Sequence, residues 1–178
     1  MKTTNLLLLT LLLSLSANLQ ARLYDIEILF FERTDNQYLD AENSLSQFEL
    51  KEKPMGKLIP EKNPTILKPA AYSLRKKGFR IIKHLAWRAN IKNKRRAPWY
   101  QISAGNKLNG LVRISVQRYL HVEFDLTFRQ DANGFGQRQY RFKEKRRMRS
   151  RKLHYLDHPR MGILIEIRPA SRKASPPL

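Results

Sequence analysis

The 178-residue sequence contains no cysteine and only one long, mainly apolar run, ten residues at its N-terminus. The lack of cysteine excludes disulfide bonds, thiolate metal sites and cysteine nucleophiles. Beyond the N-terminal run, no segment reaches the roughly 18 consecutive apolar residues that a transmembrane helix requires. The sequence also lacks G-x-S-x-G, H-E-x-x-H and a glycine-rich phosphate loop. We therefore expect a protein that is not an enzyme and that needs no cofactor.

Acidic residues are scarce in one part of the chain. From Arg22 to Lys68 there are 7 basic and 9 acidic residues, whereas from Pro69 to the end there are 27 basic and 6 acidic residues. Six carboxylates cannot neutralise 27 cations, so most of this charge must face solvent or an anionic ligand. Inside a cell the first candidate would be nucleic acid, whereas outside the cytosol the candidates are cell wall and lipid headgroups.

The N-terminus has the pattern of a secretory signal peptide. Lys2 precedes the apolar run Leu6–Leu15, and small residues follow up to Ala21. An apolar helix of this length spans about 15 Å, half of a bilayer core, which disfavours a permanent anchor. We expect residues 1–21 to be removed by cleavage after Ala21, with Ala17 as the alternative site. An exported chain would not meet nucleic acid.

The mature chain is expected to form a single domain over residues 22–168, followed by a flexible basic tail over residues 169–178. Prolines among polar residues predict a long loop at 35–68 within this domain. Three alternatives stay open for the loop: packing on its own domain, docking to a partner, or disorder.

Alternating apolar residues predict a strand at 24–31. A helix is predicted from Pro69 to about Lys77, because proline suits the first turn and Gly78 suits the C-terminal cap. Strands are predicted from residue 79 onward, and the first of them presents Phe79, Ile81, Leu85 and Trp87 in alternation. The predicted fold class is α+β, with a mainly antiparallel β-sheet, one short helix and a long N-terminal loop.

Between residues 111 and 128 a set of apolar residues keeps to even-numbered positions throughout: Val112, Ile114, Val116, Leu120, Val122, Phe124, Leu126 and Phe128. This stretch is too long for an ordinary strand. If it folds back on itself, the loop must contain an odd number of residues, since otherwise one arm would turn its polar face to the core. A three-residue loop at 116–118 meets that condition, and one long bent strand is the alternative.

The predicted strand at 140–149 carries cations on one face. They are Arg141, Lys143, Lys145, Arg147 and Arg149. Neighbours on a strand face lie about 6.6 Å apart and repel one another unless an anion lies across them. Cross-strand Glu123 and Asp125 could pair with two of them. The pattern predicts an anion-binding track, and the alternative is a solvated charged face. Glu144 and Arg146 face the other way and are interpreted as a structural pair.

Trp99 lies in a basic stretch and has two interpretations. Its indole could stack on a sugar ring, or it could cap the edge of the core.

The stretch from His154 to His158 contains two imidazoles and the carboxylate of Asp157. In a strand the two imidazoles lie about 13 Å apart, too far to share one metal ion. We therefore expect no metal, and we expect Asp157 to accept hydrogen bonds from backbone or imidazole groups at a hairpin corner.

Four blocks of the sequence are distinctive. They are Leu23–Arg33, His84–Trp87, Arg118–Val122 with Asp125-Leu126, and Arg146-Arg147-Met148-Arg149-Ser150 followed by Leu153-His154-Tyr155-Leu156-Asp157-His158-Pro159 and Gly162. Together they resemble the CsiV family of exported peptidoglycan-binding proteins. The resemblance covers nearly all of the mature chain except the 35–68 loop, which is short for the family, and the tail. Ala89 stands where the family pattern has glutamine.

The resemblance implies a non-catalytic periplasmic protein of Gram-negative bacteria that binds peptidoglycan and supports envelope integrity. It also implies a link to a bifunctional peptidoglycan synthase through the outer-membrane lipoprotein that activates this enzyme. A basic strand face is consistent with that role, because peptidoglycan peptides carry free carboxylates that arginine binds well. The alternative function is a regulator that acts through protein contacts and touches wall or anionic lipid only by charge.

Overall fold

The structure is a computed structural model that describes residues 23–33, 56–131 and 137–171. The predicted signal peptide lies outside the described residues, as do residues 35–55 of the predicted loop and most of the predicted tail.

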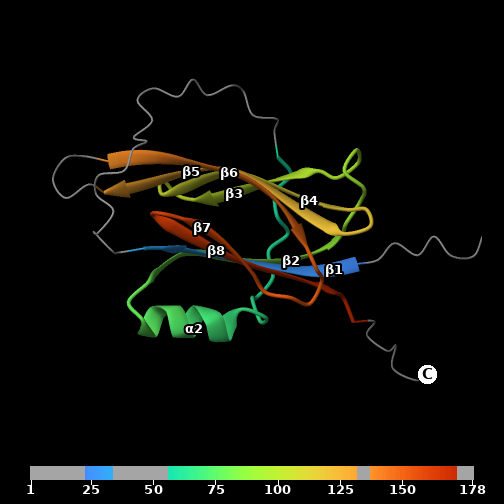
Figure 1. Ribbon diagram of the computed structural model, residues 1–178, viewed down its shortest axis with the longest axis horizontal. Coiled ribbons are helices and arrows are strands. Elements are labelled where there is room, and N and C mark those ends of the chain that lie inside the picture. The colour runs from blue at the N-terminus through green and yellow to red at the C-terminus, as the bar shows by residue number, and fades with distance from the viewer. Residues whose placement is uncertain (1–22, 34–55, 132–136, 172–178) are drawn as a thin grey trace, which may run out of the picture.

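Two antiparallel four-stranded sheets pack face to face, and one helix lies on the outer surface of the first sheet (Figure 1). Sheet A consists of β1 (Leu23–Glu32), β2 (Arg80–Asn90), β7 (His154–His158) and β8 (Met161–Pro169). Sheet B consists of β3 (Trp99–Ala104), β4 (Leu108–Val116), β5 (Leu120–Asp131) and β6 (Gln137–Met148). The strand orders are β2-β1-β8-β7 and β3-β4-β5-β6. The predicted class, mainly antiparallel with one short helix, is confirmed.

The core lies between the two sheets and takes alternate residues from each strand. From β1 it takes the predicted set of Tyr24, Ile26, Ile28 and Phe30. Phe30 meets Phe124 of β5 edge to face across the gap, with ring centroids 6.3 Å apart. The even-numbered apolar residues of β4 and β5 also point into this core, as predicted.

The turn between β4 and β5 contains an odd number of residues, as the alternation requires. Val116 pairs with Leu120, which leaves the three residues 117–119 as the loop. The predicted loop therefore has the correct length but begins one residue too early. The alternative of one long bent strand was wrong.

A register shift opposite Phe30 and Phe31 divides β2 between two apolar layers. Leu85 and Trp87 are buried between the sheets, whereas Ile81 pairs with Phe31 and packs on the helix side. The predicted alternation of β2 is therefore wrong at Ile81, because the shift reverses which face the side chains occupy.

Helix α2 (Lys68–Lys76) packs its apolar side on the outer face of sheet A. Ala71 is buried against Leu29 of β1. Gly78 follows the helix with φ 84°, a left-handed conformation that glycine adopts without strain and that ends the helix. The predicted helix is confirmed to within one residue.

Residues 56–67 run as an extended strap along one side of the sandwich (teal in Figure 1). The strap bridges to β3 between Lys57 and Tyr100 and to β2 between Glu61 and Trp87. It therefore covers an edge strand of each sheet, which shields both edges from pairing with another chain. This described part of the predicted loop packs on its own domain, one of the three alternatives.

Candidate functional site

A row of four side chains crosses the outer face of sheet B. The strand register places Trp99 of β3 beside Arg113 of β4, Arg113 beside Glu123 of β5, and Glu123 beside Lys145 of β6. These four residues are named the polar row. All four stand at odd-numbered positions, on the face that points away from the sandwich core.

Trp99, Arg113 and Glu123 contact one another in sequence along the row. The guanidinium carbon of Arg113 lies 4.4 Å from the centre of the Trp99 ring. Arg113 Nη2 donates a hydrogen bond to Glu123 Oε2 at 2.9 Å. The Arg113 and Glu123 side chains are only 20% and 15% exposed, so salt screens this ion pair less than a pair on an open surface.

Glu123 is ionised at neutral pH. Burial alone would raise the pKa of its carboxyl. The hydrogen bond and charge of Arg113, together with the charges of Lys94 and Lys145, outweigh this effect and hold the pKa below its ordinary value.

Two polar atoms of the ion pair are not used within it. Arg113 Nε and Glu123 Oε1 are buried and have no hydrogen-bond partner among the described residues. Such atoms are costly unless water or a ligand satisfies them. The centre of the polar row therefore has hydrogen-bonding capacity for an added group.

Cations from β6 and from the loop 92–96 surround the polar row. β6 contributes the exposed side chains of Lys143, Lys145 and Arg147. The Arg147 guanidinium carbon lies 4.6 Å from the ring centre of Tyr119, in the turn between β4 and β5. The basic loop 92–96 reaches the same area, since the Val116 N–H donates to the Lys92 carbonyl at 3.0 Å. The result is a surface with carboxylates at its centre and cations around them.

The structure divides the predicted track of cations on β6. Arg141 is bonded to both carboxylate oxygens of Asp125, at 3.1 and 3.0 Å, which confirms the predicted cross-strand pairing for this residue. Glu123 bonds to Arg113 of β4 rather than to a cation of β6. Arg149 follows the last residue of β6, and its backbone N–H contacts His154 Nε2 at 3.2 Å. Arg149 is therefore not part of the strand face that carries the other four cations.

Trp99 lies on the outer face of sheet B and not at the edge of the core. Its neighbour Tyr100 makes the core contact, with its ring 5.7 Å from that of Trp87. The interpretation of Trp99 as a core cap was wrong. In the structure its stacking partner is the guanidinium of Arg113.

Glu144 and Arg146 lie on the opposite side of β6 and form the predicted structural pair, 3.8 Å apart. Arg146 Nη1 also donates to the Tyr155 carbonyl at 2.6 Å and so ties β6 of sheet B to β7 of sheet A. Their neighbour Met148 is buried in the core.

The histidines of the distinctive C-terminal block lie on β7, which forms a hairpin with β8 and has Pro159 in its turn. Asp157 accepts a hydrogen bond from the Tyr155 hydroxyl at 2.6 Å and pairs with Arg33 at 3.3 Å. Its predicted position at a hairpin corner is confirmed, but the donors differ from those predicted. Burial and the bond to Asp157 raise the pKa of Tyr155 to about 12.

No group of three or more His, Cys, Asp or Glu side chains in the described part of the chain is placed to hold a metal ion.

A buried carboxylate that was not predicted from the sequence lies on the helix side of sheet A. Glu27 Oε2 accepts the N–H groups of Thr65 and Ile66 at 3.1 and 2.7 Å, and Oε1 accepts that of Leu67 at 2.8 Å. Oε1 also lies 2.7 Å from His84 Nε2. These contacts anchor the end of the strap just before α2. The available signal was a glutamate at a polar position of a strand, which does not reveal partners almost forty residues away.

Fold and site together define a β-sandwich with a mixed-charge, cation-rich face on one sheet. The family model described as "Peptidoglycan-binding protein, CsiV" matches residues 35–170. The chain therefore belongs to the CsiV family, whose name indicates peptidoglycan binding and suggests a location outside the cytoplasm. No curated protein and no solved structure gave a significant match. Among the helices of the described residues, none is long and apolar enough to cross a membrane.

Proposed function

We propose that this chain is a non-enzymatic periplasmic protein that binds peptidoglycan through the outer face of sheet B. The observation that carries the proposal is the polar row with the exposed Lys143 and Arg147 beside it. Family membership supports the ligand, and the signal-peptide pattern of residues 1–21 supports export.

The charge distribution supports a polyanionic ligand. Between Glu61 and Glu123 the chain has fifteen Lys and Arg residues and no Asp or Glu. Peptidoglycan peptides carry free carboxylates, which form charge-assisted hydrogen bonds with Arg and Lys. An open sheet face suits an extended polymer, since several repeats can lie across it at once.

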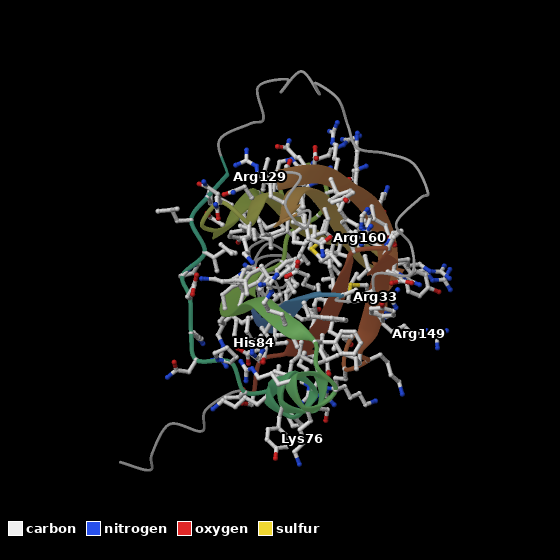
Figure 2. All side chains as sticks on the ribbon, turned by 90° about the vertical axis from the view of Figure 1, so that its left-hand side faces the viewer. Arg33, Lys76, His84, Arg129, Arg149 and Arg160 are labelled. Carbon is white, nitrogen blue, oxygen red and sulfur yellow. The ribbon has the colours of Figure 1, made fainter. Side chains whose placement is uncertain are left out.

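Co-sedimentation with purified sacculi tests the binding site. The triple variant Lys143→Gln, Lys145→Gln, Arg147→Gln should pellet at least tenfold more weakly than the parent chain. The matched control is Arg75→Gln, Lys76→Gln, Lys77→Gln, which removes the same charge at the end of α2. Figure 2 shows Lys76 at the opposite end of the molecule from Arg129, which lies on β5 of sheet B. Equal losses in the two variants would contradict a site on sheet B.

The regulatory part of the proposal is that the chain helps control wall synthesis and maintain envelope integrity. Its expected partners are a bifunctional peptidoglycan synthase and the outer-membrane lipoprotein that activates it. The exposed Leu58 of the strap is a suitable position for a photo-crosslinking residue, because its side chain is 80% exposed. Crosslinking in cells should yield an adduct with one of these two proteins. If neither forms an adduct from any exposed position of the strap, contact through the strap is ruled out.

A further inference from the structure

The outer face of sheet B is not uniformly positive. Glu123 and Asp125 lie on its second-to-last strand. Along the register Glu123 lies between Arg113 and Lys145, and Asp125 lies beside Lys143. Asp125 is bonded to Arg141, and Glu123 is bonded to Arg113. A ligand that carried only negative charge would meet these carboxylates at the centre of its binding face. A ligand with both an amino group and carboxylates would complement both the carboxylates and the cations of this surface.

The aromatic ring of the site is already occupied on one face. Sugar rings bind proteins by stacking on an open aromatic face, and Trp99 is the aromatic residue of the polar row. The guanidinium of Arg113 lies over its ring at 4.4 Å. The ring therefore serves to position Arg113, which in turn holds Glu123. This arrangement favours recognition of charge over recognition of a sugar face.

An acceptor is available where an amino group would be bound. Glu123 Oε1 is buried and has no partner among the described residues, while Oε2 accepts from Arg113. Lys94 and Lys145 act electrostatically on Glu123, and long lysine side chains can move aside at little cost. Once displaced, their ammonium groups would remain close enough to bind a carboxylate of the same ligand.

We propose that the polar row binds the peptide part of peptidoglycan, and that Glu123 accepts a free amino group of this peptide while Lys145 and Arg147 bind its carboxylates. This inference rests on the proposed function and adds to it the part of the polymer that is recognised. The chemical class of the ligand is a short zwitterionic peptide that carries one free amino group and at least two carboxylates.

Calorimetric titration of the chain from Arg22 onward with three soluble probes tests this inference. The first probe is a disaccharide that carries the peptide with its free amino group. The second is the same compound after acetylation of that amino group, and the third is glycan stripped of peptides by an amidase. We expect the acetylated probe to bind at least tenfold more weakly than the first, and the stripped glycan more weakly still.

The variant Glu123→Gln identifies the acceptor. It should bind the first probe about as weakly as the acetylated one, and acetylation should no longer change its affinity. Arg129→Gln is the matched control, because Arg129 is exposed on the same strand and the same face but lies outside the polar row, and it should keep the full effect of acetylation. Because the comparison of probes uses the unaltered chain, the test stands even if Glu123→Gln fails to fold.

Equal affinity for stripped glycan and for the peptide-bearing probe would overturn the inference and leave the proposed function intact. The same holds if acetylation has no effect on the unaltered chain. Failure to bind either these probes or whole sacculi would instead contradict the proposed function itself.

Discussion

Glu27 and His84 lie on neighbouring strands of sheet A, with Glu27 Oε1 2.7 Å from His84 Nε2. The Glu27 carboxylate also accepts three backbone N–H groups from residues 65–67 and is 1% exposed. Burial alone would raise its pKa, but the bonds from His84 and the backbone hold the pKa below its ordinary value. A charge thus persists in the interior and fixes the path of the chain into α2.

Removing this carboxylate should destabilise the protein strongly. Glu27→Ala leaves three backbone N–H groups and His84 without their acceptor, and we expect a loss of about 3 kcal/mol in the free energy of unfolding. The measurement is urea unfolding at neutral pH. Glu61→Ala is the matched control, because Glu61 is exposed and its pair with Lys83 should contribute about 1 kcal/mol or less. Similar losses for both variants would contradict this role of Glu27.

Arg168 should reduce the repulsion between two buried carboxylates. Glu27 lies directly opposite Glu166 in the register of β1 and β8, and both are buried. Arg168 Nε donates to Glu166 Oε1 at 2.6 Å. Arg168→Gln should therefore cost about 1–2 kcal/mol, because like charges directly opposite on neighbouring strands repel.

A double-mutant cycle measured by urea unfolding checks this point. Adding Glu166→Gln to Arg168→Gln should recover most of the lost stability, since one of the two charges disappears. Strict additivity of the two substitutions would show that Arg168 and Glu166 are not coupled and would contradict this role of Arg168.

Gly162 should not tolerate a side chain. A Cβ at this position would collide with the ring of Phe31, which pairs with Gly162 across β1 and β8. Gly162→Ala should cost about 1–3 kcal/mol, as overpacking does elsewhere. Adding Phe31→Leu should recover part of this loss, measured as the shift in the unfolding midpoint. If the double variant is less stable than the sum of the single effects, the collision is not the cause.

His158 should make the protein less stable in mild acid. Burial between Tyr140 and Phe142 lowers its pKa, against the opposing attraction of Asp157. Since the folded-state pKa lies below 6.5, the unfolded chain binds the proton first as the pH falls. The stability contributed by neutral His158 is complete above about pH 6.5 and is lost as the pH falls toward the lowered pKa.

The slope from one such group is at most about 1.4 kcal/mol per pH unit. Unfolding free energies measured from pH 7.5 to 5 should show a smaller loss in His158→Phe than in the unaltered chain. Parallel curves for the two proteins would exclude His158 as the source.

Much of the fold followed from alternation in the sequence. The even-numbered phase from Val112 to Phe128 identified which side chains enter the core, and parity alone required an odd loop between β4 and β5. Alternation could not reveal that the strands divide into two sheets, because a buried face looks the same whether a helix or a second sheet covers it. The register shift near Ile81 could not be predicted for a related reason, since the residue types at this bulge are those of an ordinary strand.

The candidate site was predicted less completely. The exposed cations of β6 were visible because they repeat at every second residue, and the pair of Asp125 with Arg141 followed from their shared face. The polar row joins residues from four strands, and only the register brings Trp99 and Arg113 to Glu123. Which of several possible partners a side chain bonds to depends on interatomic distances. The periodicity of the sequence gives no information about these distances.

The central claim is that sheet B has a shaped site for peptidoglycan and is not merely positive. The most direct measurement is co-sedimentation of the chain from Arg22 onward with purified sacculi from about 50 to about 500 mM salt, with DNA and anionic liposomes as competitors. We predict that binding persists at high salt and that neither competitor displaces the protein. Loss of binding at moderate salt, with equal competition from every polyanion, would contradict the claim.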